Sequence, residues 1–548
     1  MIAAAVPPRI AFVNPSVGFS DRRKSKPIGL AYIMAYLREH GFDSCGFDFG
    51  DSEDDALALA EHYQLDRFDV VGFSVYNESF LNAVRMASWI RRRRPDTLII
   101  VGGPHATAVH EHIARHHDCF DIVVRREGEE TMLEIARHAS DRAALASIAG
   151  TTVRQASGGA PIVNPDREFL KELDELPFPD AEFVSHSGYP PSTYFDEVQG
   201  RLKPALTICS SRSCPYNCSF CGVLTIGRKY RSRASERVAE ELQYFRARHD
   251  VHYEHIYFSD ANFFVSPKRA LAIARALHDA DPSVTFSFGT RVNQILRARG
   301  VLPELKACGL RFIELGVESA SPAVLERLAK GVAPSVNVAA VRLLHQLGME
   351  IALDFIMLDP ASTLDDVEAN IGFLRDTGFY DYLPHDHLYT TLVLYEGTPI
   401  RRFYEERFRV TFNPDELPAA QTLFERPEVQ RLCDELRWFR RTWQGRIDEV
   451  LARLEFAMLD RDRAIAAADR ARMQLDSIAL RHAPNLFFEN LIADARAGYP
   501  RVSTGGAPAL LPVLGYDRVT LAALLERAER AEPAAGDRYP THVASGRS

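Results

Sequence analysis

The stretch Cys214-Pro215-Tyr216-Asn217-Cys218-Ser219-Phe220-Cys221 sets three thiols in a CxxxCxxC spacing, directly after an apolar run at 205–208. Three cysteines this close can all reach one cubane iron–sulfur cluster as thiolates, whereas a structural zinc site normally closes with four protein ligands at other spacings. No fourth ligand follows nearby in the sequence. One iron of such a cluster would stay open and could bind a small molecule through amino and carboxylate groups. The spacing therefore predicts a site for chemistry at Cys214, Cys218 and Cys221.

This motif resembles that of the radical S-adenosylmethionine (SAM) superfamily. The resemblance implies that the triad binds a [4Fe–4S] cluster and that SAM chelates the open iron. The aromatic residue before the last cysteine, Phe220, fits the family, and so do the flanking segments 211–213, 230–233 and 240–241. The alternatives are a zinc knuckle, a plain ferredoxin-type cluster or chance.

Length and composition narrow the class of protein. A chain of 548 residues is too long for one ordinary core and predicts two to four domains. With 65 basic and 74 acidic residues the net charge is −9, which gives no support for nucleic-acid binding. No apolar run reaches the roughly 20 residues of a membrane span, and the N-terminus lacks the charged region of a signal peptide. We expect a cytoplasmic protein with no membrane span.

The remaining cysteines fit that compartment, since they show no disulfide-like pattern. We expect them to be buried small hydrophobes: Cys45, Cys119, Cys209, Cys308 and Cys433. Cys209 lies close enough to the triad to be a spare ligand, which is the less favoured interpretation.

Residues 1–145 alternate β-branched apolar runs with amphipathic helices, which predicts a doubly wound, Rossmann-like parallel sheet. Five strands are expected, at 9–14, 46–49, 70–75, 98–103 and 121–124. Ligands of such sheets bind at the carboxyl ends of the strands, where Ser74, Gly102, Gly103 and His105 fall. The glycines would let a flat or bulky ligand approach the backbone, and Ser74 could hydrogen-bond it. A dinucleotide is disfavoured because no GxGxxG follows the first strand.

The pattern instead resembles the cobalamin (B12)-binding domain found in front of many radical SAM enzymes. Five stretches match in order: 14–15, 27–32, 71–74, 101–107 and 127–131. The family usually has glycine where Arg126 stands, so the loop there could close differently. The segment also lacks the DxHxxG that supplies an axial histidine to cobalt. The resemblance implies cobalt with no protein histidine beneath it, and His105 is expected to be a loop histidine near the ligand.

Residues 146–203 are predicted to be a linker that holds a hairpin, 150–154 with 160–164, and a proline-punctuated extended stretch at 173–180. Residues 204–400 then repeat strand and helix. Six strands are expected, at 205–208, 255–258, 285–288, 312–316, 351–357 and 388–394. Six such units match the partial (β/α)6 barrel of radical SAM enzymes, with chemistry at the carboxyl ends of the strands.

Polar residues follow the other predicted barrel strands. By resemblance, Asp260 and Asn262 lie near the SAM amino group and Glu318 and Ser319 near its ribose. Arg291 follows the third strand, and Thr398 is expected near the adenine. A capping or loop-stabilising role is the alternative for each of these residues. Leu358 stands where the family often has a glycine, which leaves the adenine contact there in doubt.

Residues 401–531 are predicted to form a helical cap. Apolar residues recur there at steps of three or four, namely Leu432, Leu436, Phe439, Trp443, Ile447, Leu451, Leu454 and Met458. This stripe predicts an amphipathic helix pair packed over the open side of the barrel or its substrate. Residues 532–548 are rich in Ala, Gly, Pro and Ser, and we expect disorder.

The combination is similar to the B12-dependent radical SAM enzymes. The resemblance implies three cofactors (a [4Fe–4S] cluster, SAM and cobalamin) and an electron donor such as flavodoxin or ferredoxin. The first expectation is methylation of an unactivated carbon in a small-molecule or peptide substrate, a natural-product or cofactor precursor. Cobalamin-dependent ring formation without methyl transfer is the alternative. The sequence identifies neither the substrate nor a catalytic side chain.

Two further classes are disfavoured. Methylthiotransferases place three more cysteines in the N-terminal domain, where this chain has Cys45 and Cys119. A non-catalytic cobalamin or iron–sulfur sensor that binds a partner or DNA is opposed by the acidic net charge and by the filled set of barrel strand ends.

Overall fold

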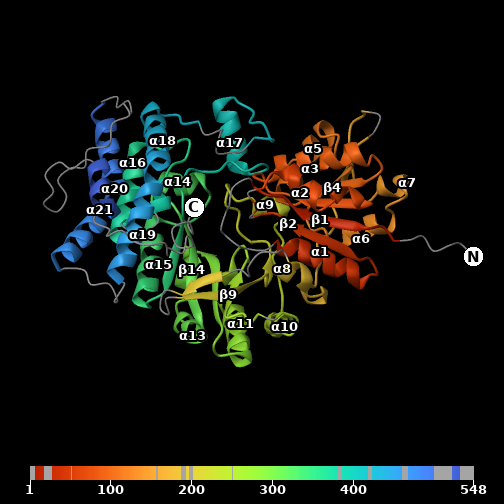
Figure 1. The fold of residues 1–548 in the computed structure, drawn as a ribbon, viewed down its shortest axis with the longest axis horizontal. Helices are drawn as coiled ribbons and strands as arrows, with labels where there is room; N and C mark the ends of the chain where they lie inside the picture. The colour runs from red at the N-terminus through yellow and green to blue at the C-terminus, as the bar shows by residue number, and fades with distance from the viewer. Residues whose placement is uncertain are drawn as a thin grey trace, which may run out of the picture.

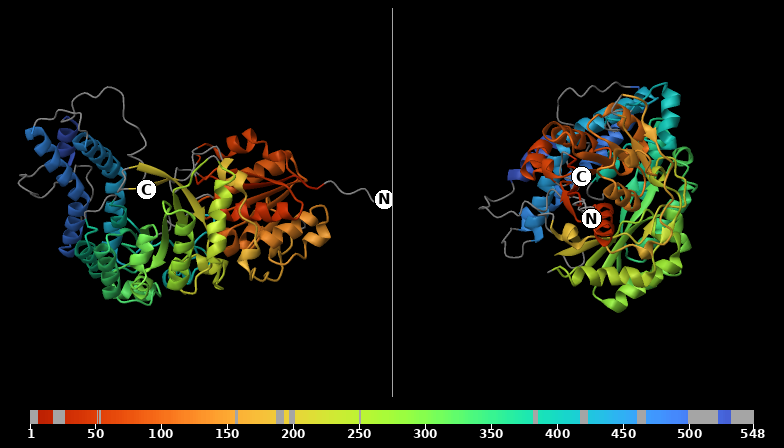
Figure 2. Two further views of the ribbon diagram at one scale, coloured as in Figure 1. Left: turned by 90° about the horizontal axis from the view of Figure 1, so that it is seen from below. Right: turned by 90° about the vertical axis from the view of Figure 1, so that its right-hand side faces the viewer.

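The computed structural model describes residues 7–17, 27–50, 52, 54–155, 158–186, 193–196, 201–249, 251–380, 385–416, 423–459, 467–498 and 521–530. An N-terminal sheet domain, a partial barrel and a helical C-terminal region lie in a row (Figures 1 and 2). The predicted disordered tail, 532–548, lies outside the described residues. Among the described helices, none is long and apolar enough to cross a membrane.

The N-terminal domain is the predicted doubly wound sheet. Its parallel strands are β1 (Ile10–Asn14), β2 (Ser44–Asp48), β3 (Val70–Ser74), β4 (Leu98–Gly102) and β5 (Ile122–Val124), in the order β2-β1-β3-β4-β5. Side chains alternate between two separate cores, because successive residues of a strand face opposite sides. One core packs under α1 (Ile28–Glu39) and α6 (Glu129–Arg137), the other under α2 (Ala56–His62), α3 (Phe80–Arg93) and α5 (His110–His116).

The hairpin predicted in the linker is present but belongs to this sheet. Strand β6 (Thr151–Val153) pairs antiparallel with β5, and β7 (Ile162–Val163) pairs antiparallel with β6. The physical reason is that β5 would otherwise expose an edge of unpaired backbone groups. We therefore propose that the first domain extends to Val163 instead of ending at residue 145. The chain then passes through η2 (Leu173–Glu175) and α8 (Ala181–His186) to the barrel.

The barrel sheet has five parallel strands: β9 (Arg201–Ile208), β12 (His255–Phe258), β13 (Thr285–Arg291), β14 (Leu310–Glu318) and β15 (Glu350–Phe355). Strand β8 (Thr193–Asp196) adds an antiparallel edge beside β9. Outward-facing apolar residues such as Phe258, Phe288 and Leu315 are fully buried in the core that the outer helices share. These helices include α10 (Ser235–Arg246), α11 (Pro267–Ala280), α15 (Pro334–Gln346) and α16 (Leu364–Thr377).

The sixth predicted barrel strand, at 388–394, is wrong. The segment begins as a 3-10 turn, η4 (His385–Leu388), and then makes one isolated parallel bridge, Leu358 to Thr391. Its apolar side chains explain the departure, because Leu392 and Leu394 are buried in a separate cluster with Tyr404 of α17 (Pro399–Phe408). This packing draws the chain off the sheet after the bridge.

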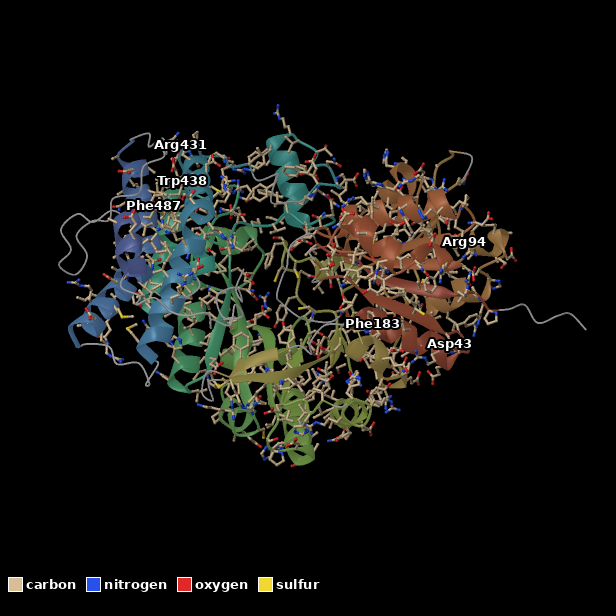
Figure 3. The ribbon with its side chains drawn as sticks, in the orientation of Figure 1. Asp43, Arg94, Phe183, Arg431, Trp438 and Phe487 are labelled. Atoms are coloured by element: carbon tan, nitrogen blue, oxygen red, sulfur yellow. The ribbon has the colours of Figure 1, made fainter. Side chains whose placement is uncertain are left out.

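The C-terminal region consists of α18 (Pro427–Phe439), a π-helical turn (Arg440–Gln444), α19 (Gly445–Leu459), α20 (Ala467–Arg496) and α21 (Leu521–Arg530). The predicted apolar stripe is confirmed as core packing, since most of its members are buried in the same core as the barrel. Trp438 and Phe439 contact Phe487 of α20, with ring centroids 6.2 and 4.4 Å apart (Figure 3). Arg496 pairs with Glu368 of α16 at 2.9 Å, so this bundle covers the last barrel helix.

Candidate active site

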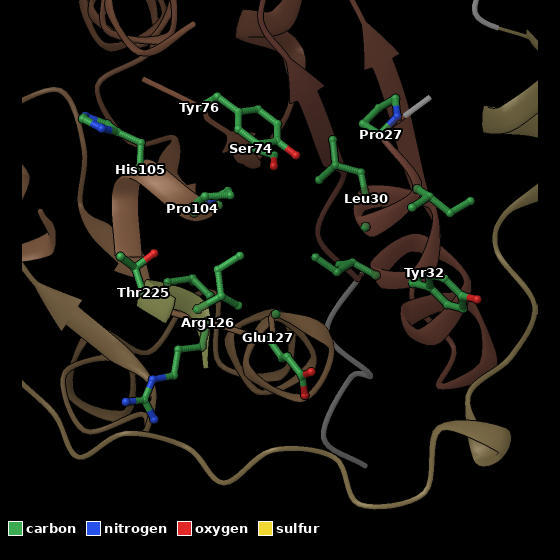
Figure 4. Close-up of a pocket in the computed structure, with 18 of the residues that line it drawn as sticks. Pro27, Leu30, Tyr32, Ser74, Tyr76, Pro104, His105, Arg126, Glu127 and Thr225 are labelled. Atoms are coloured by element: carbon green, nitrogen blue, oxygen red, sulfur yellow. The ribbon is translucent and has the colours of Figure 1, made fainter. Parts of the chain in front are cut away.

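A cavity of about 780 Å³ opens between the N-terminal sheet and the mouth of the barrel. Ser74, Tyr76 and Gly103 line it from the carboxyl ends of β3 and β4 (Figure 4). Thr207 and Cys221 line it from the barrel. Its volume lies in the range of small-molecule and cofactor sites. Neither domain alone would enclose this space.

Glycines shape the N-terminal wall of the cavity. Gly103 has φ +98°, and a Cβ there would lie 2.8 Å from the backbone N and O of Val75, so this position tolerates glycine alone. Gly29 also lines this wall, Gly222 of the cysteine loop lines the cavity from the barrel, and a Cβ on either would meet no atom within 4 Å. Side chains at these two positions would fill the cavity. The wall is thus a bare backbone cradle suited to a large flat ligand, as the sequence predicted at Gly102 and Gly103.

His105 lies at the edge of this wall with its ring directed away from the middle of the cavity (Figure 4). The ring packs against Phe80 with centroids 4.8 Å apart, and the Asn77 amide lies 3.3 Å from Nδ1. Burial lowers the pKa of His105 to about 4, so the ring is neutral at pH 7. This geometry supports the interpretation of His105 as a loop histidine.

Arg126 stands where the family usually has glycine, and its backbone adopts the left-handed conformation that favours glycine, with φ +64°. Two contacts hold it there. Its backbone N–H donates to Thr107 Oγ1 at 2.9 Å, and its guanidinium pairs with Asp166 at 2.6 Å. The loop therefore takes a glycine-like conformation without a glycine.

Four charged side chains, two of them buried and two half-buried, join the two domains beside the cavity. Glu127 and Glu129, at the start of α6, meet Arg212 and Arg231 from the short hairpin β10 (Ser211–Arg212) and β11 (Arg231–Ser232). Arg231 donates to both Glu127 oxygens at 2.7 and 2.9 Å, and Arg212 donates to Glu129 at 2.6 Å. Burial acts to raise the pKa of Glu127, but the two guanidiniums outweigh it and lower that pKa overall. The four residues hold the cysteine loop against the N-terminal domain.

The three cysteines of the motif lie in the loop between β10 and β11 and precede α9 (Val223–Ile226). Burial is the largest cause that raises the pKa of Cys221 to about 11, and the neighbouring Cys218 and Cys214 contribute to the same rise, as expected of thiols that lie close together. Arg291 donates to the Cys218 sulfur and stacks on Tyr216 with its guanidinium carbon 4.1 Å from the ring centroid. Buried thiols beside a guanidinium fit a cluster that needs thiolate ligands.

The other cysteines separate from this group. Cys209 lines the cavity, but its thiol donates to the Ser211 carbonyl at 3.3 Å and burial raises its pKa to about 12, which does not support the spare-ligand alternative. Cys119, Cys308 and Cys433 are buried as predicted. Cys209 is only half-buried, and the same prediction is wrong for Cys45, which is exposed because it lies on β2, the edge strand of the sheet.

Three of the predicted SAM contacts are engaged within the protein. The Asp260 carboxylate accepts hydrogen bonds from the Ser210 N–H and hydroxyl, both at 2.7 Å, and from Ser211. Ser319 donates to Asn370 Oδ1 at 2.8 Å, and Thr398 donates to the carbonyl of Tyr395 at 2.6 Å. These contacts favour the loop-stabilising alternative.

Asn262 remains the better candidate for SAM, because Arg291 donates to Cys218 and to the Lys330 carbonyl and Glu318 pairs with Lys330. Asn262 is fully buried beside Cys214 and accepts from Thr290 at 2.9 Å, while its Nδ2 has no hydrogen-bond partner among the described residues. Glu318 has φ +63° and accepts from Lys330 at 2.6 Å. An unsatisfied buried donor next to the cysteine loop fits a site that is completed by a polar ligand.

Sequence reasoning did not select three residues that line the cavity. Tyr76 and Tyr395 both line it and are 58% and 38% exposed, so each offers aromatic surface to a large planar ligand. Burial raises the pKa of Glu396 to about 7, against the opposing effect of Arg401. The sequence could have indicated these residues only by their positions directly after predicted strands. Many other loop residues have such positions, so this signal does not single them out.

Comparisons with known proteins match both halves of this site. The B12 binding domain family matches residues 19–136 and the Radical SAM superfamily matches residues 208–374. An uncharacterised methyltransferase of Pyrococcus horikoshii is 29% identical over 68% of this chain and 77% of its own length. An anaerobic magnesium-protoporphyrin IX monomethyl ester cyclase of Rubrivivax gelatinosus is 25% identical over 67% of this chain and 66% of its own length.

A solved structure shares the fold. The cobalamin-dependent S-adenosylmethionine radical enzyme OxsB, with aqua-cobalamin and S-adenosylmethionine bound, superimposes with a TM-score of 0.66 at 18% identity. The match covers 89% of this chain and 75% of OxsB. At this identity the likeness supports the arrangement of the two domains and the fold of each.

Proposed function

The chain belongs to the cobalamin-binding radical SAM enzymes, whose cofactors are cobalamin, SAM and a [4Fe–4S] cluster, and we propose that it methylates an unactivated carbon. One observation carries the proposal. A single cavity is lined by the glycine cradle of the N-terminal domain and by Cys221 of the cluster loop. A methyl donor held on one wall and a radical generated at the other would therefore share one enclosed space.

The residues of the chain have distinct parts in this proposal. Cys214, Cys218 and Cys221 would hold the cluster, while Ser74, Gly103 and Tyr76 would hold the corrin. When bound, SAM on the reduced cluster supplies a 5′-deoxyadenosyl radical and methylcobalamin supplies the methyl group. The charged pairs that join the domains would exclude water from the cavity and would fix the position of its two walls relative to each other. The electron would come from a donor such as flavodoxin or ferredoxin, and the substrate would be a small molecule or peptide.

Ring formation without methyl transfer is the second candidate. It is favoured by the likeness to the Rubrivivax gelatinosus cyclase, which extends over both domains. The two functions differ in how much SAM they consume. A methyltransferase converts two SAM molecules per turnover, giving one S-adenosylhomocysteine when the cobalt is remethylated and one 5′-deoxyadenosine from the radical step. A cyclase needs only the SAM molecule that gives 5′-deoxyadenosine.

An experiment with SAM that carries a deuterated methyl group distinguishes methyl transfer from ring formation. The methyltransferase should yield deuterated methylcobalamin on the enzyme before any substrate is added, as seen by mass spectrometry. With its substrate, the label should pass to the product while the two adenosyl products form in about equal amounts. Production of 5′-deoxyadenosine and an unlabelled, altered substrate without S-adenosylhomocysteine would contradict methylation and favour ring formation.

A further inference from the structure

Two histidines and one aspartate, none of which contributes to the cavity lining, meet at the seam between the N-terminal domain and the segment after the barrel. His112 lies on α5 and His117 directly follows it, while Asp415 lies in the turn after α17. Both Nε2 atoms point at the same oxygen, with His112 at 3.2 Å and His117 at 3.1 Å from Asp415 Oδ1. The second oxygen, Oδ2, is also 3.1 Å from His117 Nε2.

From this geometry we propose that His112, His117 and Asp415 bind a Zn²⁺ ion that ties the two segments together. One ligand atom from each residue lies within 4.8 Å of the others. Zinc bonds of 2.0–2.1 Å in a tetrahedron place neighbouring ligand atoms about 3.3 Å apart, close to the separations between the histidines and the carboxylate. Imidazole and carboxylate are zinc ligands, and the site needs no thiol.

Access also suits a metal. The side chains are partly open, with 26% of His112, 13% of His117 and 26% of Asp415 exposed. A water molecule could therefore reach the fourth tetrahedral position, and zinc could enter from solvent.

The ion would form a second tie between domains, apart from the buried pairs of Glu127 and Glu129. It would also lie near the cavity, since Phe80 packs against both His117 and His105, with centroids 5.1 and 4.8 Å away. The negative charge of Asp415 acts to raise the pKa of both His105 and Glu396. Zinc bound to Asp415 would offset that negative charge at the cavity wall.

Equilibrium dialysis of the cluster-loaded and cobalamin-loaded enzyme against Zn²⁺ tests the site. Zinc and iron are measured together by mass spectrometry, so that zinc taken up by emptied cysteines is recognised by the matching loss of iron. The wild type should bind one zinc at constant iron. Asp415→Asn and His117→Gln should each bind zinc at least about 10-fold more weakly, because each removes a ligand but keeps the size of the side chain.

His116→Ala is the matched control, since this neighbouring histidine is outside the triad and its variant should bind zinc as the wild type does. Zinc should raise the thermal midpoint of the wild type and of His116→Ala, but not that of Asp415→Asn. Equal zinc affinity in the wild type and Asp415→Asn would overturn the proposal. So would equal loss of binding in His116→Ala, or zinc uptake that always accompanies iron loss.

Discussion

Arg212, on the strand β10 that directly precedes the cysteine motif, donates to Glu129 of the N-terminal domain at 2.6 Å, and the two side chains are 16% and 4% exposed. Beside it, Arg231 holds Glu127 through two hydrogen bonds. A buried pair is weak evidence for net stability, but removing one partner leaves a costly uncompensated charge. The position of the cluster loop relative to the cobalamin domain therefore depends on these four residues.

Arg231→Met should destabilise the protein by about 3 kcal/mol, because Glu127 would lose its bidentate partner and keep only Arg212 at 3.4 Å. Thermal unfolding measures the loss. The double variant Arg231→Met/Glu127→Gln should recover much of it, since the poorly paired carboxylate is removed. Arg93→Met, which breaks exposed pairs, should change stability by about 1 kcal/mol or less. A midpoint for Arg231→Met equal to that of Arg93→Met would contradict the role of the interdomain pairs.

The Cys218→Ala variant should lose the cluster and SAM cleavage. Anaerobically reconstituted wild type should contain about four irons per chain, as a cubane requires. Cys209→Ala is the matched control, because its thiol donates to the Ser211 carbonyl and should not bind iron. Iron analysis and 5′-deoxyadenosine formation give the result. Full iron content in Cys218→Ala, or loss of iron in Cys209→Ala, would show that the ligands are assigned wrongly.

Cobalt should carry no histidine from the protein, because the His105 ring points away from the cavity. The EPR spectrum of the cob(II)alamin form should then lack nitrogen superhyperfine splitting, and His105→Ala should give the same spectrum. Splitting that disappears in His105→Ala would make this histidine an axial ligand.

Gly29→Leu should weaken cobalamin binding without unfolding the protein, since its side chain would project into open space of the cavity. Leucine is also a better helix former than glycine within α1. We expect a loss of affinity of about 10-fold or more, measured by binding of hydroxocobalamin. Gly372→Leu is the control, because that helical glycine also has no neighbouring atom within 4 Å but lies in α16, away from the cavity lining. Equal affinity in the two variants would place the corrin elsewhere.

Acid should destabilise the protein partly through His105. Its pKa is about 4 in the folded state, lowered chiefly by burial, against an ordinary value of 6.5. Between these values the unfolded chain binds more protons, so the free energy of unfolding falls as the pH falls from about 6.5 to about 4. His105→Gln should reduce this loss by about 2 kcal/mol at pH 5. Thermal midpoints at pH 7.5 and pH 5 measure it, with the exposed His62→Gln as a control that should keep the wild-type dependence.

The sequence by itself determined the two domain types, and it predicts the cluster ligands. Runs such as 98–102 are β-branched and continuous, and a strand buried on both faces requires that pattern wherever it lies. The spacing of Cys214, Cys218 and Cys221 is equally local, because three thiols on one turn converge whatever surrounds them. The left-handed backbone conformation at Arg126 could not be predicted from the sequence, because contacts with Thr107 and Asp166 hold it.

Only the tertiary structure decided which other parts of the chain those elements contact. Leu392 and Leu394 fit a strand pattern, yet they pack against α17 and leave the sheet, because a competing apolar cluster lies closer to them. Tyr76 and Tyr395, more than 300 positions apart in sequence, became cavity residues through the docking of the two domains. His117 and Asp415 likewise meet across 298 positions. Such sites depend on packing between distant parts of the chain, so no local spacing of residues predicts them.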